Sequence, residues 1–193
     1  MEKKFERRGI NMNLPNKITM LRIVMIVPFV FFMLTDIVPY SNIIAAVIFI
    51  AASLTDTLDG FIARKYNLVS NFGKFMDPLA DKLLVSSALI CFAAHPDSPM
   101  PVWGVIIIIS REFIISGFRL VASDEGVVIA ASWWGKYKTV SQMIMSVLLI
   151  INFDGYVINI IENVFIYVSI ALTVISLIDY IVKNHHVLDD GKL

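Results

Sequence analysis

The residues best able to do chemistry are four aspartates, which lie in two pairs on either side of a short connecting stretch. Asp56 and Asp59 are three residues apart, and Asp77 and Asp81 are four apart, so on helices each pair shares one face. Two helices that meet here would direct four carboxylates toward one place. Because carboxylates repel one another and offer only oxygen ligands, the cluster predicts two bound divalent cations, Mg²⁺ or Mn²⁺.

The residues around the first pair suit a bulky, phosphorylated substrate. Two divalent cations about 3.5–4 Å apart stabilise in-line displacement at phosphorus. Gly60 and Ala63 are small and leave room for a flat group against the helix, and Arg64 can bind a phosphate. Small residues also suit close helix packing, but the adjacent Asp and Arg residues favour substrate binding. Gly73 is expected to allow a tight turn in the following link.

A group of cations follows in the second half of the chain. Arg111 and Arg119 are eight residues apart, a little over two helical turns, so they lie roughly on one face. Together with Lys136 they are expected to line a site for a phosphorylated substrate beside the aspartates. Two interpretations of Lys138 stay open. It belongs to this site, or its side chain extends from a helix end to the membrane interface.

These residues are set in a strongly apolar chain. Its 193 residues are 58% hydrophobic with a mean hydropathy of +0.77, above the roughly 45–50% typical of soluble domains. We therefore expect an all-α polytopic membrane protein with a single domain over residues 1–193. Residues 1–17 form a basic juxtamembrane segment, part of which could be an interfacial helix. The expected membrane helices span residues 18–35, 42–66, 76–94, 101–122, 136–153 and 158–182.

The distribution of Lys and Arg predicts the orientation in the membrane. The links near 36–42, 95–101 and 153–158 contain neither residue, so both termini and the aspartate cluster are expected to be cytoplasmic. A bacterial plasma membrane is the expected location. Asp56 lies less than about 20 residues after the start of its helix, so it should sit within the membrane's depth and face a polar cavity. The net charge of zero gives no sign of a nucleic-acid partner.

The spacing Asp-x2-Asp-Gly-x2-Ala-Arg-x8-Gly-x3-Asp-x3-Asp over residues 56–81 resembles the signature of the CDP-alcohol phosphotransferase family, with every fixed position present. The six-helix layout of that family fits the whole chain. The resemblance implies a homodimer in which Asp56, Asp59 and Asp77 hold the two cations. It implies that Asp81 is the general base on the acceptor hydroxyl and also touches a metal. The CDP-lipid site would comprise Gly60, Ala63, Arg64 and Gly73.

Looser matches point to family members that use sn-glycerol 3-phosphate. The segment from Asn13 to Arg22, with Asn16 and Thr19, looks like the N-terminal segment of those members, and the residues around Arg111 and Lys136 match as well. The resemblance implies transfer of a phosphatidyl group from CDP-diacylglycerol to sn-glycerol 3-phosphate, with release of CMP. Asn16 and Thr19 would then belong to the CDP-lipid site. The residues expected to bind the acceptor phosphate are Arg111, Arg119 and Lys136.

Three alternatives compete with this interpretation. A family member with another phosphorylated acceptor, such as inositol phosphate, stays open, whereas the cations disfavour serine or phosphatidylglycerol. A small ion transporter would spread its acids along the membrane normal and would not need Gly60, Ala63 or Arg64. A structural membrane subunit would not tolerate such costly buried charges.

Overall fold

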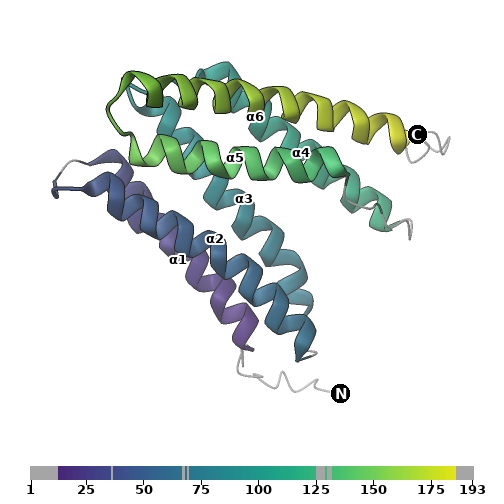
Figure 1. Ribbon diagram of the computed structural model, residues 1–193. Helices are drawn as coiled ribbons and strands as arrows, with labels where there is room; N and C mark the ends of the chain where they lie inside the picture. The colour runs from purple at the N-terminus through teal and green to yellow at the C-terminus, as the bar shows by residue number, and fades with distance from the viewer. Residues whose placement is uncertain are drawn as a thin grey trace, which may run out of the picture.

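The computed structural model describes residues 13–35, 37–66, 68, 70–124, 129 and 132–185, and these residues form helices joined by short links (Figure 1). The described part contains six helices and no strand, which confirms the all-α prediction. The expected juxtamembrane helix lies mainly outside the described residues. The helices are α1 (Leu14–Leu34), α2 (Ser41–Lys65), α3 (Asn71–Ala94), α4 (Val102–Asp124), α5 (Trp133–Ile151) and α6 (Tyr156–Lys183).

Two helices begin several residues earlier than their apolar segments predict. Helix α1 begins at Leu14 because the side chain of Asn13 accepts a hydrogen bond from the backbone N–H of Asn16, 3.1 Å away. Helix α3 begins at Asn71 because the hydroxyl of Ser70 caps it in the same way. These caps add polar turns that hydropathy does not reveal, and both added turns carry residues of the predicted site.

The surface of the helices suits a membrane. By length and composition alone, three helical stretches in the described residues could each cross a bilayer: Leu14–Leu34, Ser41–Ala63 and Tyr156–Lys183. The helices α3, α4 and α5 carry charged residues and are not apolar enough over a membrane-spanning length to be counted with them. Large apolar side chains such as Val27, Val47 and Ile106 are exposed. The architecture is that of an all-α membrane protein.

The helices pack in two groups that share one apolar core. Helix α1 packs against α2 and α3, α6 packs against α4 and α5, and α5 also contacts α2 (Figure 1). The core is built from fully or almost fully buried side chains of all six described helices, among them Phe29, Phe49, Leu84, Leu89, Ile108, Met145, Ile150 and Ile166. The two groups are therefore joined through their core and hold the site residues in fixed relation.

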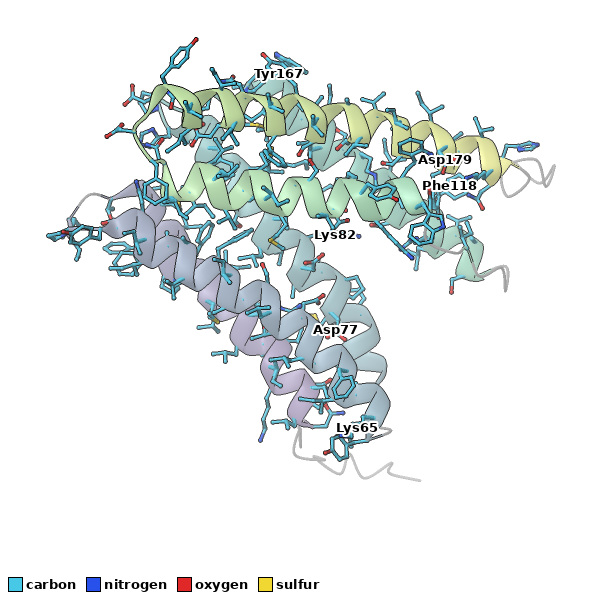
Figure 2. The ribbon with its side chains drawn as sticks, in the orientation of Figure 1. Lys65, Asp77, Lys82, Phe118, Tyr167 and Asp179 are labelled. Atoms are coloured by element: carbon cyan, nitrogen blue, oxygen red, sulfur yellow. The ribbon has the colours of Figure 1, made fainter. Side chains whose placement is uncertain are left out.

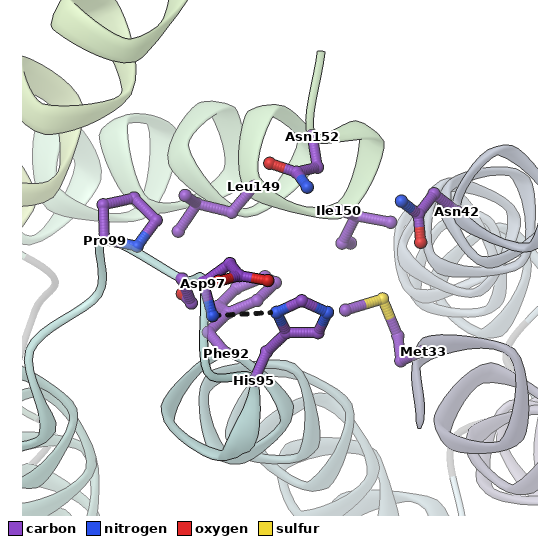
Figure 3. A pocket seen from close by; sticks show the side chains of 10 residues that line it. Met33, Asn42, Phe92, His95, Asp97, Pro99, Leu149, Ile150 and Asn152 are labelled. Atoms are coloured by element: carbon purple, nitrogen blue, oxygen red, sulfur yellow. Dashed lines mark hydrogen bonds between the residues drawn. The ribbon is translucent and has the colours of Figure 1, made fainter. Parts of the chain in front are cut away.

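The links after α1, α3 and α5 lie at one end of the molecule, on the left in Figure 1. A small cavity at this end is lined by Met33, Phe92, His95 and Asp97, among others (Figure 3). The backbone N–H of Asp97 donates to Nδ1 of His95 over 3.4 Å. His95 follows the last residue of α3, whereas Asp77 lies near its start, so His95 is at the opposite end from the aspartates.

Candidate active site

Arg22 on α1 joins the first aspartate pair. Its Nη1 lies 2.7 Å from Oδ1 of Asp56, and its Nη2 lies 2.6 Å from Oδ2 of Asp59. Its Nε donates to the hydroxyl of Thr55 over 3.2 Å. Because the Arg22 and Asp59 side chains are buried, with 0% and 2% exposed, each charge depends on the other for compensation. Sequence analysis did not assign this role, although an Arg within an apolar run calls for a carboxylate partner.

Thr19, one turn before Arg22, connects the two aspartate pairs. Its Oγ1 lies 2.6 Å from Oδ1 of Asp77 and 3.4 Å from Oδ2 of Asp59. The same hydroxyl is 3.1 Å from the carbonyl oxygen of Pro15. Carboxylates from α2 and α3 therefore meet at one side chain of α1. The structure brings together Asp56, Asp59 and Asp77 at the junction of three helices.

Asp81 lies one turn further along α3 and is exposed to a cavity between the two helix groups. It interacts electrostatically with Asp56 on one side and with Glu112 and Lys138 on the other. Figure 2 shows the same progression along α3, with Asp77 among α1–α3 and Lys82 nearer to the second group. Asp81 is thus the carboxylate that links the cluster to the cavity.

The oxygen ligands of the four aspartates suit divalent cations in their chemistry, but in this arrangement Arg22 pairs with two of these carboxylates. The four carboxylates offer only oxygen ligands, and Asp59 interacts electrostatically with both Asp56 and Asp77. Within the described residues, no three His, Cys, Asp or Glu side chains converge closely enough to hold a metal ion. A cation that binds here would share Asp56 and Asp59 with Arg22 or replace its contacts.

The cavity has a volume of about 530 Å³ and is lined by residues of α3, α4, α5 and α6. Arg111, Arg119 and Lys136, which the sequence predicts to share a site, all line it together with Asp81. Lys136 Nζ also lies 4.2 Å from the ring centroid of Trp133. Lys82 and Glu112 line it as well, so four cations and two carboxylates face a space large enough for a small phosphorylated molecule.

Two hydrogen bonds orient Arg111. Its Nε donates to the hydroxyl of Ser176 over 3.2 Å, and its Nη1 donates to Oε1 of Glu112 over 3.0 Å. A Cβ added at Gly135 would lie 3.5 Å from Nη2, so the glycine leaves space beside the guanidinium. Lys138 is buried and pairs with the same Glu112 oxygen. The extension of Lys138 to the interface is therefore wrong, because its charge is compensated inside the protein.

Lys82 is a further cation of the cavity that sequence analysis missed. It follows Asp81 directly, lines the cavity and donates to the hydroxyl of Ser116 on α4. A lysine at the start of an apolar run was the available signal, because such a residue requires a polar partner. Glu112, Ser176 and Tyr180 were also missed, since nothing in the sequence places α6 against α4.

Of the residues expected in the CDP-lipid site, Asn16 and Gly73 meet at the start of α3. The buried Asn16 accepts a hydrogen bond from the hydroxyl of Ser70 over 2.8 Å. Gly73 lies inside α3, so the predicted tight turn is wrong. It is instead a place of close approach, since a Cβ there would lie 3.1 Å from Oδ1 of Asn16. Gly60 and Ala63 are half-buried on α2, and the side chain of Arg64 lies outside the described residues.

The chain is similar in sequence to known proteins. Residues 12–175 match the family model described as CDP-alcohol phosphatidyltransferase. The chain is 44% identical over 189 residues to the CDP-diacylglycerol–glycerol-3-phosphate 3-phosphatidyltransferase of Bacillus subtilis, an alignment that covers 91% of this chain and 97% of the relative. Identity to the protein of the same name from Haemophilus influenzae is 37% over 186 residues, with 94% and 98% covered. A probable phosphatidylglycerophosphate synthase of Mycobacterium tuberculosis is 36% identical over 173 residues, with 89% and 81% covered.

Proposed function

The chain belongs to the CDP-alcohol phosphatidyltransferase family, and from this premise we propose that it transfers the phosphatidyl group of CDP-diacylglycerol to sn-glycerol 3-phosphate. The products are phosphatidylglycerophosphate and CMP, and the reaction belongs to phospholipid biosynthesis. The supporting observation is the cavity in which Asp81 faces Arg111, Arg119 and Lys136. A base beside three cations suits an acceptor that carries both a hydroxyl and a phosphate.

We propose that Asp56, Asp59, Asp77 and Asp81 hold two divalent cations, Mg²⁺ or Mn²⁺. When bound, these ions neutralise the diphosphate of the donor and the charge that develops on departing CMP. Gly60 and Ala63 leave room for the CDP group. The remaining donor contacts are assigned to Asn16, Thr19, Arg64 and Gly73, with the Arg64 guanidinium on the diphosphate.

Asp81 is proposed to act on the acceptor as general base. A free alcohol hydroxyl has a pKa far above neutral pH and attacks phosphorus poorly until its proton is removed. Asp81 takes that proton while the acceptor oxygen bonds to the β-phosphorus. The bond from the β-phosphorus to the oxygen bridging the two phosphates breaks, and CMP keeps that oxygen. Arg111, Arg119 and Lys136 hold the acceptor phosphate, so that its hydroxyl points toward Asp81.

The acceptor is tested directly by following CMP release. The purified protein is supplied with CDP-diacylglycerol, Mg²⁺ or Mn²⁺, and one of four acceptors: sn-glycerol 3-phosphate, inositol phosphate, serine or phosphatidylglycerol. CMP release is expected with sn-glycerol 3-phosphate. Preference for inositol phosphate would contradict the proposed acceptor and leave the family reaction intact.

Replacing Arg111 or Arg119 by Lys should raise the KM for sn-glycerol 3-phosphate by roughly tenfold or more. A guanidinium binds phosphate oxygens as a fork, which an ammonium cannot copy, and a charge-assisted contact is worth about 1.5–3 kcal/mol. The KM for CDP-diacylglycerol should change little. Steady-state kinetics in both substrates give the answer, with Lys183→Arg on exposed α6 surface as the matched control. If only the KM for CDP-diacylglycerol rose, Arg111 and Arg119 on α4 would belong to the donor site instead.

We further propose that the protein is a multi-pass homodimer of the cell membrane with its site and both termini facing the cytoplasm. The absence of Lys and Arg from the links near 36–42, 95–101 and 153–158 supports this orientation. The homodimer rests on family resemblance alone. Cross-linking in intact membranes followed by size analysis tests it, and a purely monomeric protein would contradict it.

The orientation is tested with three matched Tyr→Cys variants in a Cys91→Ser background. Tyr40, Tyr66 and Tyr156 are 77%, 62% and 82% exposed and lie in or beside links between helices. Tyr40→Cys and Tyr156→Cys should react with a membrane-impermeant thiol reagent added to intact cells. Tyr66→Cys should react only after the membrane is opened. The reverse labelling pattern would place the site on the outer side.

A further inference from the structure

The hydroxyl of Tyr180 is buried and has no hydrogen-bond partner within the described residues. Tyr180 lies on α6, is 3% exposed and lines the same cavity as Asp81 and Arg111. Buried polar groups are nearly always paired, so an unpaired hydroxyl on a residue that lines a cavity calls for a partner. The cavity is where a substrate would enter, so that partner is a bound molecule.

The ring of Tyr180 is held in place from α4. It packs edge-on against Phe118, with ring centroids 5.6 Å apart and planes at 82°. The guanidinium carbon of Arg119 lies 5.9 Å from the Tyr180 ring centroid. Figure 2 shows that Phe118 and Asp179, the residue before Tyr180, come close together at one end of α4 and α6. The hydroxyl is therefore positioned before any ligand arrives.

The chemistry of the hydroxyl differs from that of its neighbours. Arg111, Arg119 and Lys136 only donate hydrogen bonds and carry charge, which suits the phosphate of the acceptor. A phenol is neutral, and it both donates and accepts, which suits an alcohol. In sn-glycerol 3-phosphate the primary hydroxyl attacks the donor, and the secondary hydroxyl is left for recognition.

We propose that the hydroxyl of Tyr180 binds the non-reacting secondary hydroxyl of the acceptor, which makes Tyr180 a specificity-determining residue. This inference rests on the proposed function. In this proposal the acceptor is recognised at two groups: the cations bind its phosphate, and Tyr180 binds its secondary hydroxyl. The enzyme should therefore distinguish acceptors that carry the same phosphate and the same primary alcohol.

The test removes one hydroxyl from the enzyme and one from the substrate. Tyr180→Phe keeps the ring and its packing on Phe118, and 3-hydroxypropyl phosphate lacks only the secondary hydroxyl of the natural acceptor. The wild type should favour sn-glycerol 3-phosphate in kcat/KM by about tenfold, the effect of one well-placed hydrogen bond. In Tyr180→Phe this preference should fall to about threefold or less. The change should come from slower use of sn-glycerol 3-phosphate, with the analogue unaffected.

The controls distinguish a failure of the role of Tyr180 from a failure of the proposed transferase function. Tyr167→Phe alters an exposed tyrosine elsewhere on α6 and should keep the wild-type preference. An equal loss with both acceptors, or no loss with either, would overturn the role of Tyr180. If the wild type releases no CMP with sn-glycerol 3-phosphate, the proposed acceptor fails instead. The KM for CDP-diacylglycerol and the melting temperature of Tyr180→Phe should match those of the wild type.

Discussion

Replacing Asp56, Asp59 or Asp77 by Asn is expected to remove nearly all CMP release, and excess EDTA should do the same to the wild type. Each carboxylate is a proposed ligand of the divalent cations, whose stabilisation of charge at phosphorus is worth several kcal/mol, or about a factor of 10³ or more. An amide keeps the shape of the side chain but loses the negative charge. Activity is measured as CMP release at saturating CDP-diacylglycerol and acceptor.

The stability of each variant must be measured beside its activity. Asp59→Asn leaves the buried Arg22 with one charged partner, so thermal unfolding shows whether that variant remains folded. Binding of Mn²⁺, followed by electron paramagnetic resonance, gives a second measure that does not depend on turnover. Asp97→Asn, at the opposite end of α3, is the matched control and should keep full activity. Full turnover of the wild type in excess EDTA would end the proposal of a metal-dependent site.

Asp81→Asn is expected to lower kcat by about 10²–10⁴, the usual effect of removing a general base. The acceptor hydroxyl keeps its proton in this variant, whereas the donor should still bind. Asp81 is the member of the cluster that faces the cavity with the cations, so its loss affects the acceptor side first. Single-turnover measurements with pre-bound CDP-diacylglycerol isolate the transfer step.

The role of Asp81 is decided by comparing the loss in kcat with the loss in affinity for CDP-diacylglycerol. A general base gives a loss in kcat far larger than any loss in affinity for CDP-diacylglycerol. A variant that no longer binds the donor, with a turnover loss no greater than the binding loss, would make Asp81 a structural metal ligand. Lys82→Met is a useful comparison, because it alters the next residue of α3 and leaves the carboxylate in place.

The features that sequence reasoning predicted are those set by local periodicity. The three-residue spacing of Asp56 and Asp59 places both on one face of α2, and Arg22 contacts both. The eight-residue spacing of Arg111 and Arg119 likewise brings both to one cavity. Apolar runs located the six helices, since their length and hydropathy are properties of the sequence itself.

The features that sequence reasoning missed depend on contacts between segments that are far apart in the chain. Gly73 was expected in a turn, but the cap at Ser70 extends α3 past it, and Asn16 on α1 is what approaches it closely. The partner of Lys138 is Glu112, which is on another helix. Neither periodicity nor composition predicts which faces of α1 and α3, or of α4 and α5, meet, so these pairs could not be derived from the sequence.

The pairing of Arg22 with Asp56 and Asp59 also has a consequence for the biogenesis of the protein. A single charged side chain costs up to about 2.5–3.5 kcal/mol when it is inserted alone at a bilayer centre. The aspartates follow Arg22 by 34 and 37 residues, so they leave the ribosome after it. Helices α1 and α2 that enter the bilayer together as a hairpin carry Arg22 already paired with both aspartates, so the net charge of the three side chains falls to −1. The ion pair thus favours cooperative insertion of the first two helices over insertion one at a time.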